Sequence, residues 1–309
     1  MTRAQEKHDS LDWREEARTI VIAFGYFTRF PVPHGVAFTD ARLARSARYF
    51  PVVGAVVGAL GALTFGIGSH VLPLSVAVLL SIIATLLATG ALHEDGLADC
   101  CDAFGGGYQR TDVLRILKDS RIGAFGAIGL IVTLTLKWQT LQGLAAYGYG
   151  FVAAWMIVAH AASRAGAIVF TATLDYARTP KDKGQDAGHV DRRPADSGTP
   201  SIAEEDATGS AIDAKARPFQ RGSGNDVRAE HATRATKGVI IALVLGLPGL
   251  FWHGIALGLV LIGAGAVLHW LLGRWWLRRI GGYTGDCLGL AQQLFEMGIY
   301  LIVLAWISS

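Results

Sequence analysis

Hydrophobic residues in this chain are gathered into long runs, and polar segments separate them. A helix needs about 20 mostly apolar residues to cross a bilayer. Seven runs approach or reach that length: 49–72, 74–93, 124–146, 150–173, 238–252, 254–272 and 286–307. The fifth run is short, and Pro248-Gly249 form a turn between it and the sixth. The pattern predicts an all-α polytopic membrane protein with about seven transmembrane helices, within a range of six to eight.

Two polar segments flank or interrupt these runs. Residues 1–48 are basic and are expected to lie at the membrane interface, where they meet anionic head groups. Residues 176–237 are rich in Asp, Lys, Arg, Ala, Gly and Pro. Such a composition buries too little apolar surface to offset the entropy of ordering the chain. We therefore predict one membrane domain over 1–309, with a largely disordered loop at 176–237.

Charge gives the expected orientation. The chain has 28 Lys and Arg residues, and 26 of them lie in 1–48, 94–123, 174–237 and 273–285. With seven spans, all four segments fall on one side of the bilayer. The positive-inside rule then places them, and the N-terminus, in the cytoplasm. Residues 1–19 are largely polar, so no secretory signal peptide is expected.

The segment His93–Gly107 carries four carboxylates within nine positions, directly after a hydrophobic run. If it is helical, Asp95, Asp99 and Asp102 fall within about 60° of arc. Like charges on one stripe repel each other, whereas a divalent cation with oxygen ligands turns that repulsion into binding. Glu94 and these three aspartates are therefore candidate Mg²⁺ ligands. The following Gly105, Gly106 and Gly107 would let backbone amides approach a phosphate.

Two further segments add polar groups at the ends of hydrophobic runs. Lys118-Asp119-Ser120-Arg121-Ile122-Gly123 offers cations for phosphate oxygens, and carboxylates with cations are the parts of a phosphoryl-transfer site. In Gly281–Gly289, Thr284 or Asp286 is placed to cap the last helix, whose N-terminal amides suit an anion. The simpler alternatives are topology-setting charge in the first segment and an ordinary helix cap in the second.

Arg164 and Glu296 lie inside hydrophobic runs, with His160 one turn before the arginine and Gln292-Gln293 one turn before the glutamate. Ionisable groups inside a span suggest function by default. The simpler alternative is a structural ion pair between them.

From the residues alone, the chain is a membrane enzyme that handles a phosphate-bearing substrate with Mg²⁺ at the cytoplasmic face. The residues do not indicate which molecule accepts the transferred phosphate-bearing group. A CDP-alcohol-type or prenyl-type transferase acting on a lipid is one alternative. A transporter with Arg164 and Glu296 as its coupling pair, or a non-catalytic scaffold, are others.

The order of the motifs resembles the cobalamin synthase family, the adenosylcobinamide-GDP ribazoletransferases. The matching segments are Phe27–Pro33, His93–Asp99, Lys118–Gly123, Ser163-Arg164, Tyr176–Arg178 and Gly281–Gly289 with Ala291–Gln293. They extend from about 20 to 307, apart from the polar loop. The resemblance implies an enzyme of the inner membrane of a prokaryote, with its active site facing the cytoplasm.

The activity that the resemblance implies is the last joining step of the cobalamin nucleotide loop. A hydroxyl of α-ribazole, or of its 5′-phosphate, attacks adenosylcobinamide-GDP with Mg²⁺ as cofactor, giving adenosylcobalamin (or its 5′-phosphate) and GMP. Partners are these substrates and the bilayer, with no nucleic acid; contact with other late corrinoid enzymes and the oligomeric state are left open.

Residue roles follow from the resemblance and the residues together. The expected metal ligands are Glu94, Asp95, Asp99 and Asp102, and Asp102 or Asp119 is the expected base. The expected catalytic residues are Asp95, Asp99, Asp102 and Asp119. The expected substrate-binding residues are Arg29, Gly105, Gly106, Lys118, Ser120, Arg121, Arg164, Tyr283, Thr284, Gly285, Asp286 and Gln293.

Overall fold

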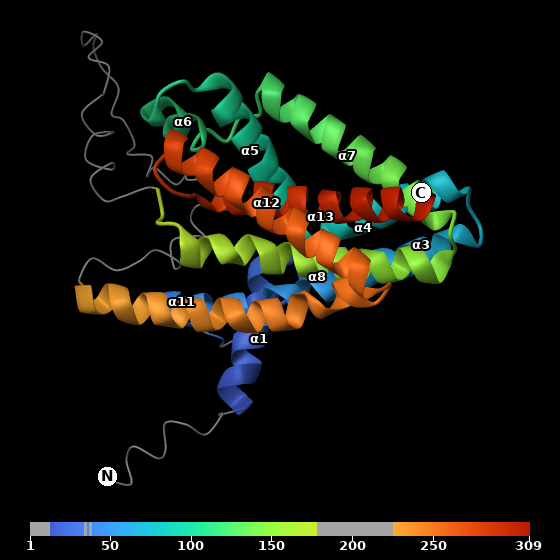
Figure 1. Ribbon diagram of the computed structural model, residues 1–309, viewed down its shortest axis with the longest axis horizontal. Coiled ribbons are helices and arrows are strands. Elements are labelled where there is room, and N and C mark those ends of the chain that lie inside the picture. Colours follow the sequence, from blue (N-terminus) through green and yellow to red (C-terminus); the bar gives the residue numbers. More distant parts are fainter. Residues whose placement is uncertain (1–12, 34–35, 37–38, 178–224) are drawn as a thin grey trace, which may run out of the picture.

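The computed structural model describes residues 13–33, 36, 39–177 and 225–309, and this part of the chain is almost entirely helical (Figure 1). Its elements are α1 (Trp13–Phe27), α2 (Asp40–Ser46), η2 (Ala47–Tyr49), α3 (Phe50–Ser69), α4 (Leu74–Thr89), α5 (Leu92–Gly106), α6 (Arg110–Ile116), α7 (Ala124–Ala145), α8 (Tyr149–Thr173), α11 (Asn225–Gly246), η4 (Pro248–Phe251), α12 (Ile255–Arg279) and α13 (Gly285–Ser308). The expected all-α polytopic membrane fold is confirmed.

The number of spans differs from the expected seven. In the described residues, five helices are long and apolar enough to cross a membrane: Arg42–Ser69, α7, α8, α12 and α13. The run predicted at 74–93 corresponds to α4, which forms with α5 a broken pair bent by 89°. This pair brings the count to six if it forms one span. The run predicted at 238–252 belongs to a shorter apolar helix, Thr236–Phe251.

The bend between α4 and α5 has a local cause. Gly90 ends α4 with φ 66°, and Ala91 follows with φ 55°. Two successive residues in the left-handed region stop a right-handed helix, and a non-glycine residue adopts this conformation only at a cost. The acidic segment therefore begins a new helix in a new direction.

The predicted disordered loop at 176–237 is only partly covered by the structure. Residues 178–224 lie outside the described part. From Asn225 the chain is already helical as α11, so the prediction is wrong for 225–237.

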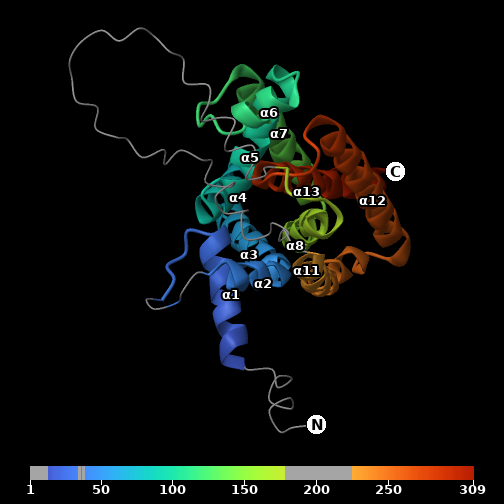
Figure 2. The same cartoon turned by 90° about the vertical axis from the view of Figure 1, so that its left-hand side faces the viewer.

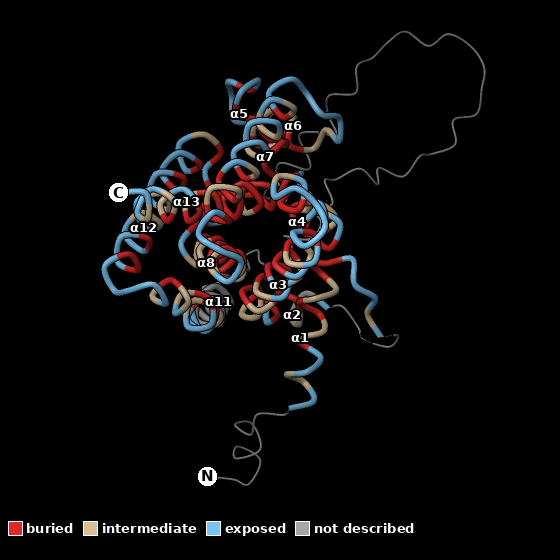
Figure 3. Tube along the Cα trace, turned by 90° about the vertical axis from the view of Figure 1, so that its right-hand side faces the viewer, coloured by how far each residue is buried: buried red, intermediate tan, exposed pale blue. Residues whose placement is uncertain are grey.

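Two helices form the centre of the bundle. Two thirds of the apolar stretch of α8 and of α13 is buried, against about a fifth for α7 and α12 at the periphery (Figures 2 and 3). The contact between α3 and α8 is close because Gly54 and Gly58 face the α8 backbone; an added methyl group at Gly58 would lie 2.5 Å from the Met156 carbonyl oxygen. Small residues allow this kind of backbone approach in lipid.

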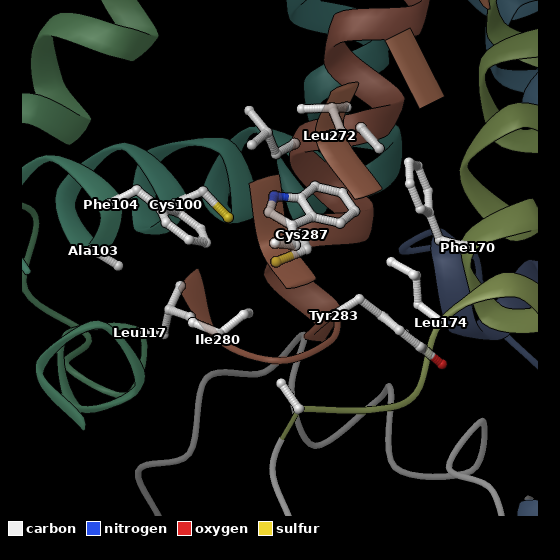
Figure 4. Close-up of a cluster of buried hydrophobic side chains, with 14 of the residues drawn as sticks. Cys100, Ala103, Phe104, Leu117, Phe170, Leu174, Leu272, Ile280, Tyr283 and Cys287 are labelled. Atoms are coloured by element: carbon white, nitrogen blue, oxygen red, sulfur yellow. The ribbon is translucent and has the colours of Figure 1, made fainter. Parts of the chain in front are cut away.

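The two ends of the bundle differ in what they carry. The α3–α4 and α7–α8 connections and the C-terminus lie at one end, on the right in Figure 1, while α6 and the α12–α13 connection lie at the other. At that second end, α5, α6, α8, α12 and α13 share a hydrophobic core that includes Phe104, Leu117, Phe170 and Trp276 (Figure 4). This core holds the acidic helix against the start of α13.

Candidate active site

The acidic helix α5 divides its carboxylates between two environments. Asp95 is exposed and Asp99 is partly exposed, and their spacing of four places them on one face of the helix. Glu94, by contrast, is buried and accepts a hydrogen bond from Gln293 of α13 at 2.9 Å. The side of α5 that carries Glu94 faces α13, where Gly289 allows close contact with His93 and Gly96.

Asp102 joins α5 to the start of α7. One carboxylate oxygen accepts from the amide of Gly123 at 2.7 Å, and the other from the amide of Gly126 at 2.8 Å. Gly123 has no side chain to cap α7, so Asp102 supplies the cap from another helix. The acidic helix and the Lys118–Gly123 segment, separate motifs in the sequence, are thereby fastened together.

The Lys118–Gly123 segment lies at the surface between α6 and α7. The side chain of Arg121 donates to both oxygens of Asp119, at 2.9 Å from Nε to Oδ1 and 2.7 Å from Nη2 to Oδ2. These bonds lower the pKa of Asp119 to about 2. Arg121 is 86 % exposed, Ser120 is exposed and Lys118 is partly exposed. The segment thus presents polar groups to solvent one turn of α5 beyond Asp99.

The segment before α13 is capped as predicted but is sealed from solvent. Thr284 caps α13 by accepting from the amide of Cys287 at 3.4 Å. Tyr283, Thr284 and Asp286 are each at most 1 % exposed, and Gly285 is buried. Backbone bonds tie this segment to the end of α8: the amide of Tyr283 donates to Asp175 at 3.0 Å, and that of Ala177 donates to Tyr283 at 2.8 Å.

Arg110 of α6 holds the same region from the other side. Its guanidinium donates to the carbonyl of Ile280 at 3.0 Å and to that of Ala177 at 2.7 Å. Arg279 likewise donates to the carbonyl of Gly107. These two arginines connect the C-terminal end of α5, α6, the end of α8 and the α12–α13 connection.

The glycines at 105–107, which were expected to let backbone amides approach a phosphate, lie at the end of a helix. Gly105 and Gly106 form the last turn of α5, and Gly107 is its C-cap. The C-terminus of a helix presents carbonyl groups, which carry partial negative charge and do not favour a phosphate. An added methyl group at Gly105 would lie 2.8 Å from the Phe125 ring, so this glycine allows α5 to pack against α7.

A chain of buried polar side chains crosses the bundle behind α5. Gln293 donates to Glu94 and to Gln292 at 2.9 and 2.7 Å, and Gln292 donates to Glu296 at 2.8 Å. Glu296 forms an ion pair with Lys137 of α7 at 2.5 Å and lies 3.3 Å from His160 of α8. Arg164, for which an ion pair with Glu296 was the simpler alternative, bonds the carbonyl and ring of His160, at 2.9 and 3.2 Å.

The remaining predicted binding residues lie in different surroundings. Arg29 is exposed beside the α4–α5 bend, where its amide donates to the carbonyl of Ala88 at 2.7 Å. Arg164 is 3 % exposed and Gln293 is also 3 % exposed, both inside the bundle. Of the predicted cations, Arg29, Lys118 and Arg121 are thus the ones that reach the surface.

The four carboxylates predicted to bind Mg²⁺ differ in whether their oxygens are placed to reach a metal ion. Within the described residues, no three His, Cys, Asp or Glu side chains are grouped as a metal site. Glu94 is turned toward Gln293, and both oxygens of Asp102 accept backbone amides. Asp95 and Asp99 fit Mg²⁺, because this ion is commonly held by one or two carboxylates, with waters and substrate phosphates as its other ligands. A site made by the protein alone from all four carboxylates does not fit.

Sequence reasoning did not assign a role to three residues of this region: Lys137, Arg110 and Arg279. Lys137 had a signal, since it is a lone cation inside a hydrophobic run. Arg110 and Arg279 donate hydrogen bonds to backbone carbonyls far away in the sequence, and no local sequence pattern predicts such contacts.

Comparison with known proteins decides the family. The family model described as cobalamin-5-phosphate synthase matches residues 19–198 and 210–304. The chain belongs to this family. The matched range includes α5, the Lys118–Gly123 segment and the start of α13, so the whole region described above lies within the family's domain.

Curated relatives agree over nearly the full length. A protein of Ralstonia nicotianae is 44% identical over 297 residues, covering 96% of this chain and 98% of the relative. A protein of Ralstonia pickettii is 43% identical over 299 residues, with the same two shares of 96% and 98%. One from Shewanella amazonensis is 36% identical over 292 residues, covering 94% and 96%. All three are named adenosylcobinamide-GDP ribazoletransferase. No solved structure matches the chain.

Proposed function

We propose that this protein joins adenosylcobinamide-GDP to α-ribazole or α-ribazole 5′-phosphate, with Mg²⁺, at the cytoplasmic face of the inner membrane. A ribose hydroxyl forms the new bond to the phosphorus attached to cobinamide. The bond from that phosphorus to GMP breaks, GMP leaves with the electron pair, and the proton of the attacking hydroxyl passes to solvent water. The relatives' activity, over nearly the whole chain, supports this reaction class.

The observation that carries the proposal is the pair of hydrogen bonds that the amides of Gly123 and Gly126 donate to Asp102. It fixes the Asp95 and Asp99 face of α5 beside a loop that carries Lys118 and Arg121. Carboxylates next to cations are what a diphosphate substrate with its metal requires.

In this proposal, Asp95 and Asp99 hold Mg²⁺, which when bound neutralises charge on the diphosphate and on the departing GMP. Lys118 and Arg121 bind phosphate oxygens, Arg121 through Nη1, since its Nε and Nη2 donate to Asp119. Arg29 adds a third surface cation next to the start of α5. Asp102 acts by positioning, because both of its oxygens are occupied by amides.

Asp119 is assigned the role of orienting the attacking hydroxyl. Its carboxylate is held by Arg121 and stays ionised above about pH 2, so it accepts a hydrogen bond without retaining the proton. Attack then depends on alignment and charge neutralisation, which supply most of the catalysis in phosphoryl transfer.

The cytoplasmic assignment is supported by charge. The end of the bundle with α6 and the α12–α13 connection carries Arg110, Arg115, Lys118 and Arg121, together with Arg278 and Arg279. The opposite end, with the α3–α4 and α7–α8 connections, has no Lys or Arg in residues 70–73 or 146–148. The positive-inside rule places the first end in the cytoplasm.

The test is GMP release by the full-length protein in detergent, given adenosylcobinamide-GDP and α-ribazole 5′-phosphate, with and without Mg²⁺. The proposal expects equal amounts of GMP and of a corrinoid product that contains the ribazole. GMP release at the same rate without added metal would show that the reaction does not require Mg²⁺. A folded, monodisperse sample that releases no GMP with either acceptor would overturn the proposed reaction.

A further inference from the structure

An apolar recess lies on the side of the bundle, between α8, α11, α12 and α13. Its volume is about 350 Å³, and it is lined by side chains such as Leu247, Leu261, Phe295 and Ile299. Among the described residues that line it, His269 is the one that can ionise. The recess opens beside Ile262 and Ala266, which are exposed on the outer surface of α12, the peripheral helix in Figure 2.

Glycines that the helix packing does not require form part of its wall. An added methyl group at Gly298 would meet no atom within 4 Å, and one at Gly265 would meet only the Phe295 ring at 3.9 Å. Gly58 on α3 is the opposite case, because the α8 backbone leaves no room for a side chain there. Glycine inside a helix costs about 0.5–1 kcal/mol relative to alanine. At Gly265 and Gly298 its structural effect is to keep the recess open.

The recess runs toward the basic end of α12. Between Leu261 and His269 the helix rises about 12 Å. Ile262, Ala266, Trp270 and Arg274 are spaced by four, so they form one ridge along the opening. Arg274 is exposed, and its guanidinium lies over the Trp270 ring at 5.8 Å. A tryptophan with an arginine at the end of a span is typical of the head-group level of a membrane.

His269 marks the same end of the recess. Its Nε2 lies 3.3 Å from the Thr173 hydroxyl, whereas its buried Nδ1 has no hydrogen-bond partner in the protein. An unsatisfied buried nitrogen is costly unless something bonds it. The recess therefore combines an apolar length with polar groups at one end only.

We propose that this recess binds one acyl chain of an anionic phospholipid, with the phosphate of the head group at Arg274. Because α12 and α13 are membrane-spanning helices, hydrocarbon chains surround the opening. A chain that enters the recess gains dispersion contacts on several sides, which a flat helix surface does not offer.

The test uses the full-length protein in vesicles that contain phosphatidylglycerol with a photoreactive group in its acyl chain. After illumination, the labelled residues are mapped by mass spectrometry. The proposal expects labelling at Leu268, Phe295 and Ile302 to exceed labelling at Leu259 and Leu271, which are exposed on α12. Equal labelling of both sets would overturn it, since that is the pattern of ordinary surrounding lipid.

A matched pair of variants gives a second readout. Gly298→Leu fills the recess. Gly263→Leu is the control, because Gly263 of α12 does not line the recess and an added methyl group there would meet no atom within 4 Å. Labelling of Phe295 is expected to fall at least five-fold in G298L and to stay unchanged in G263L. Unchanged labelling in folded G298L contradicts the proposal.

The head group is tested separately. Arg274→Gln is expected to remove the preference for phosphatidylglycerol over phosphatidylcholine while leaving the labelled residues the same. If G298L instead dissociates a dimer and lipid labelling does not change, the recess serves contact between copies and the lipid proposal fails. Neither readout depends on GMP release, so the outcome is independent of the proposed reaction.

Discussion

Neighbouring residues on α5, Glu94 and Asp95, belong to two different electrostatic regions of the molecule. Asp95 faces out with Asp99, on the helix that Asp102 fastens to the Lys118–Gly123 loop, and these groups are exposed or partly exposed. Glu94 faces in and begins the buried chain that continues through Gln293 and Gln292 to Glu296 and Lys137. We refer to these as the outer site and the inner chain.

The difference shows which charges are available to a ligand. In the inner chain, opposite charges and amides satisfy one another in a medium where an unpaired charge is very costly. In the outer site, carboxylates and cations face water, where a surface ion pair such as Asp119–Arg121 contributes little to stability. The inner chain is therefore expected to control folding, and the outer site catalysis.

Breaking the inner chain should have the largest effect. Lys137→Met removes the ion-pair partner of the buried Glu296 carboxylate and should cost about 3–5 kcal/mol of stability. Thermal unfolding in detergent, followed by circular dichroism, measures this loss. The double variant Lys137→Met with Glu296→Leu removes both charges and should recover most of it. A single variant as stable as the wild type would contradict the assignment of a buried ion pair.

The outer site should show the reverse pattern. Asp99→Asn should lower the rate of GMP release about 100-fold, because losing a carboxylate that holds Mg²⁺ removes several kcal/mol of charge stabilisation. Its unfolding temperature should stay within a degree or two of the wild type. A rate near that of the wild type at limiting Mg²⁺ would exclude Asp99 as a ligand.

Asp102 connects the outer site to the fold, so its replacement should affect both properties. Asp102→Ala removes the cap of α7 and should cost about 1–2 kcal/mol. The rate should also fall, because the Lys118–Gly123 loop loses its attachment to α5. Asp102→Asn retains one acceptor oxygen and should be intermediate in both measurements. Loss of activity without any loss of stability would instead indicate a direct role in the reaction.

Arg121→Gln should leave stability unchanged, since Arg121 is almost fully exposed. The KM for adenosylcobinamide-GDP should rise about ten-fold, the order expected for one lost bond to a charged oxygen. Steady-state kinetics with kcat and KM determined separately would show this. A fall in kcat alone would mean that Arg121 acts in the transition state rather than in binding.

The smallest expected effect concerns pH. The bonds from Arg121 hold the pKa of Asp119 at about 2, below the ordinary value near 3.9. The pairing therefore contributes fully above about pH 4 and is lost as the pH falls through about 2. Asp119→Asn should leave the dependence of stability on pH unchanged between pH 5 and 8. A shift in that range would contradict the Asp119–Arg121 pairing.

Several features of the outer site could be predicted from the sequence, but the separation of the outer site from the inner chain could not. The spacing of Asp95 and Asp99 predicts a shared helix face, and Thr284 before a hydrophobic run predicts the cap of α13; both features are present. The bend at Gly90-Ala91 could not be predicted from hydropathy, because a hydropathy pattern contains no information on backbone dihedral angles. The division of Glu94 from Asp95 depends on which face of α5 meets α13.

The inner chain was also hard to predict, for a physical reason. Lys137 of α7 and His160 and Arg164 of α8 all lie near Glu296. Spacing along the sequence does not show which residue on another helix lies closest to Glu296. Arg164 was the partner that the sequence offered as the simpler alternative, but the structure pairs Glu296 with Lys137, 159 positions away along the chain. Gly105 is a similar case, since its packing against the Phe125 ring accounts for the glycine without a phosphate.

The central claim is that the outer face of α5 performs the reaction and the inner face supports the fold. The most direct test is GMP release as a function of Mg²⁺ concentration in two adjacent variants, Asp95→Asn and Glu94→Gln. The account predicts that E94Q keeps the wild-type dependence on Mg²⁺, because an amide can still pair with Gln293, whereas D95N needs far more Mg²⁺ or fails to turn over. A normal D95N beside an E94Q that has lost its response to Mg²⁺ would contradict the account.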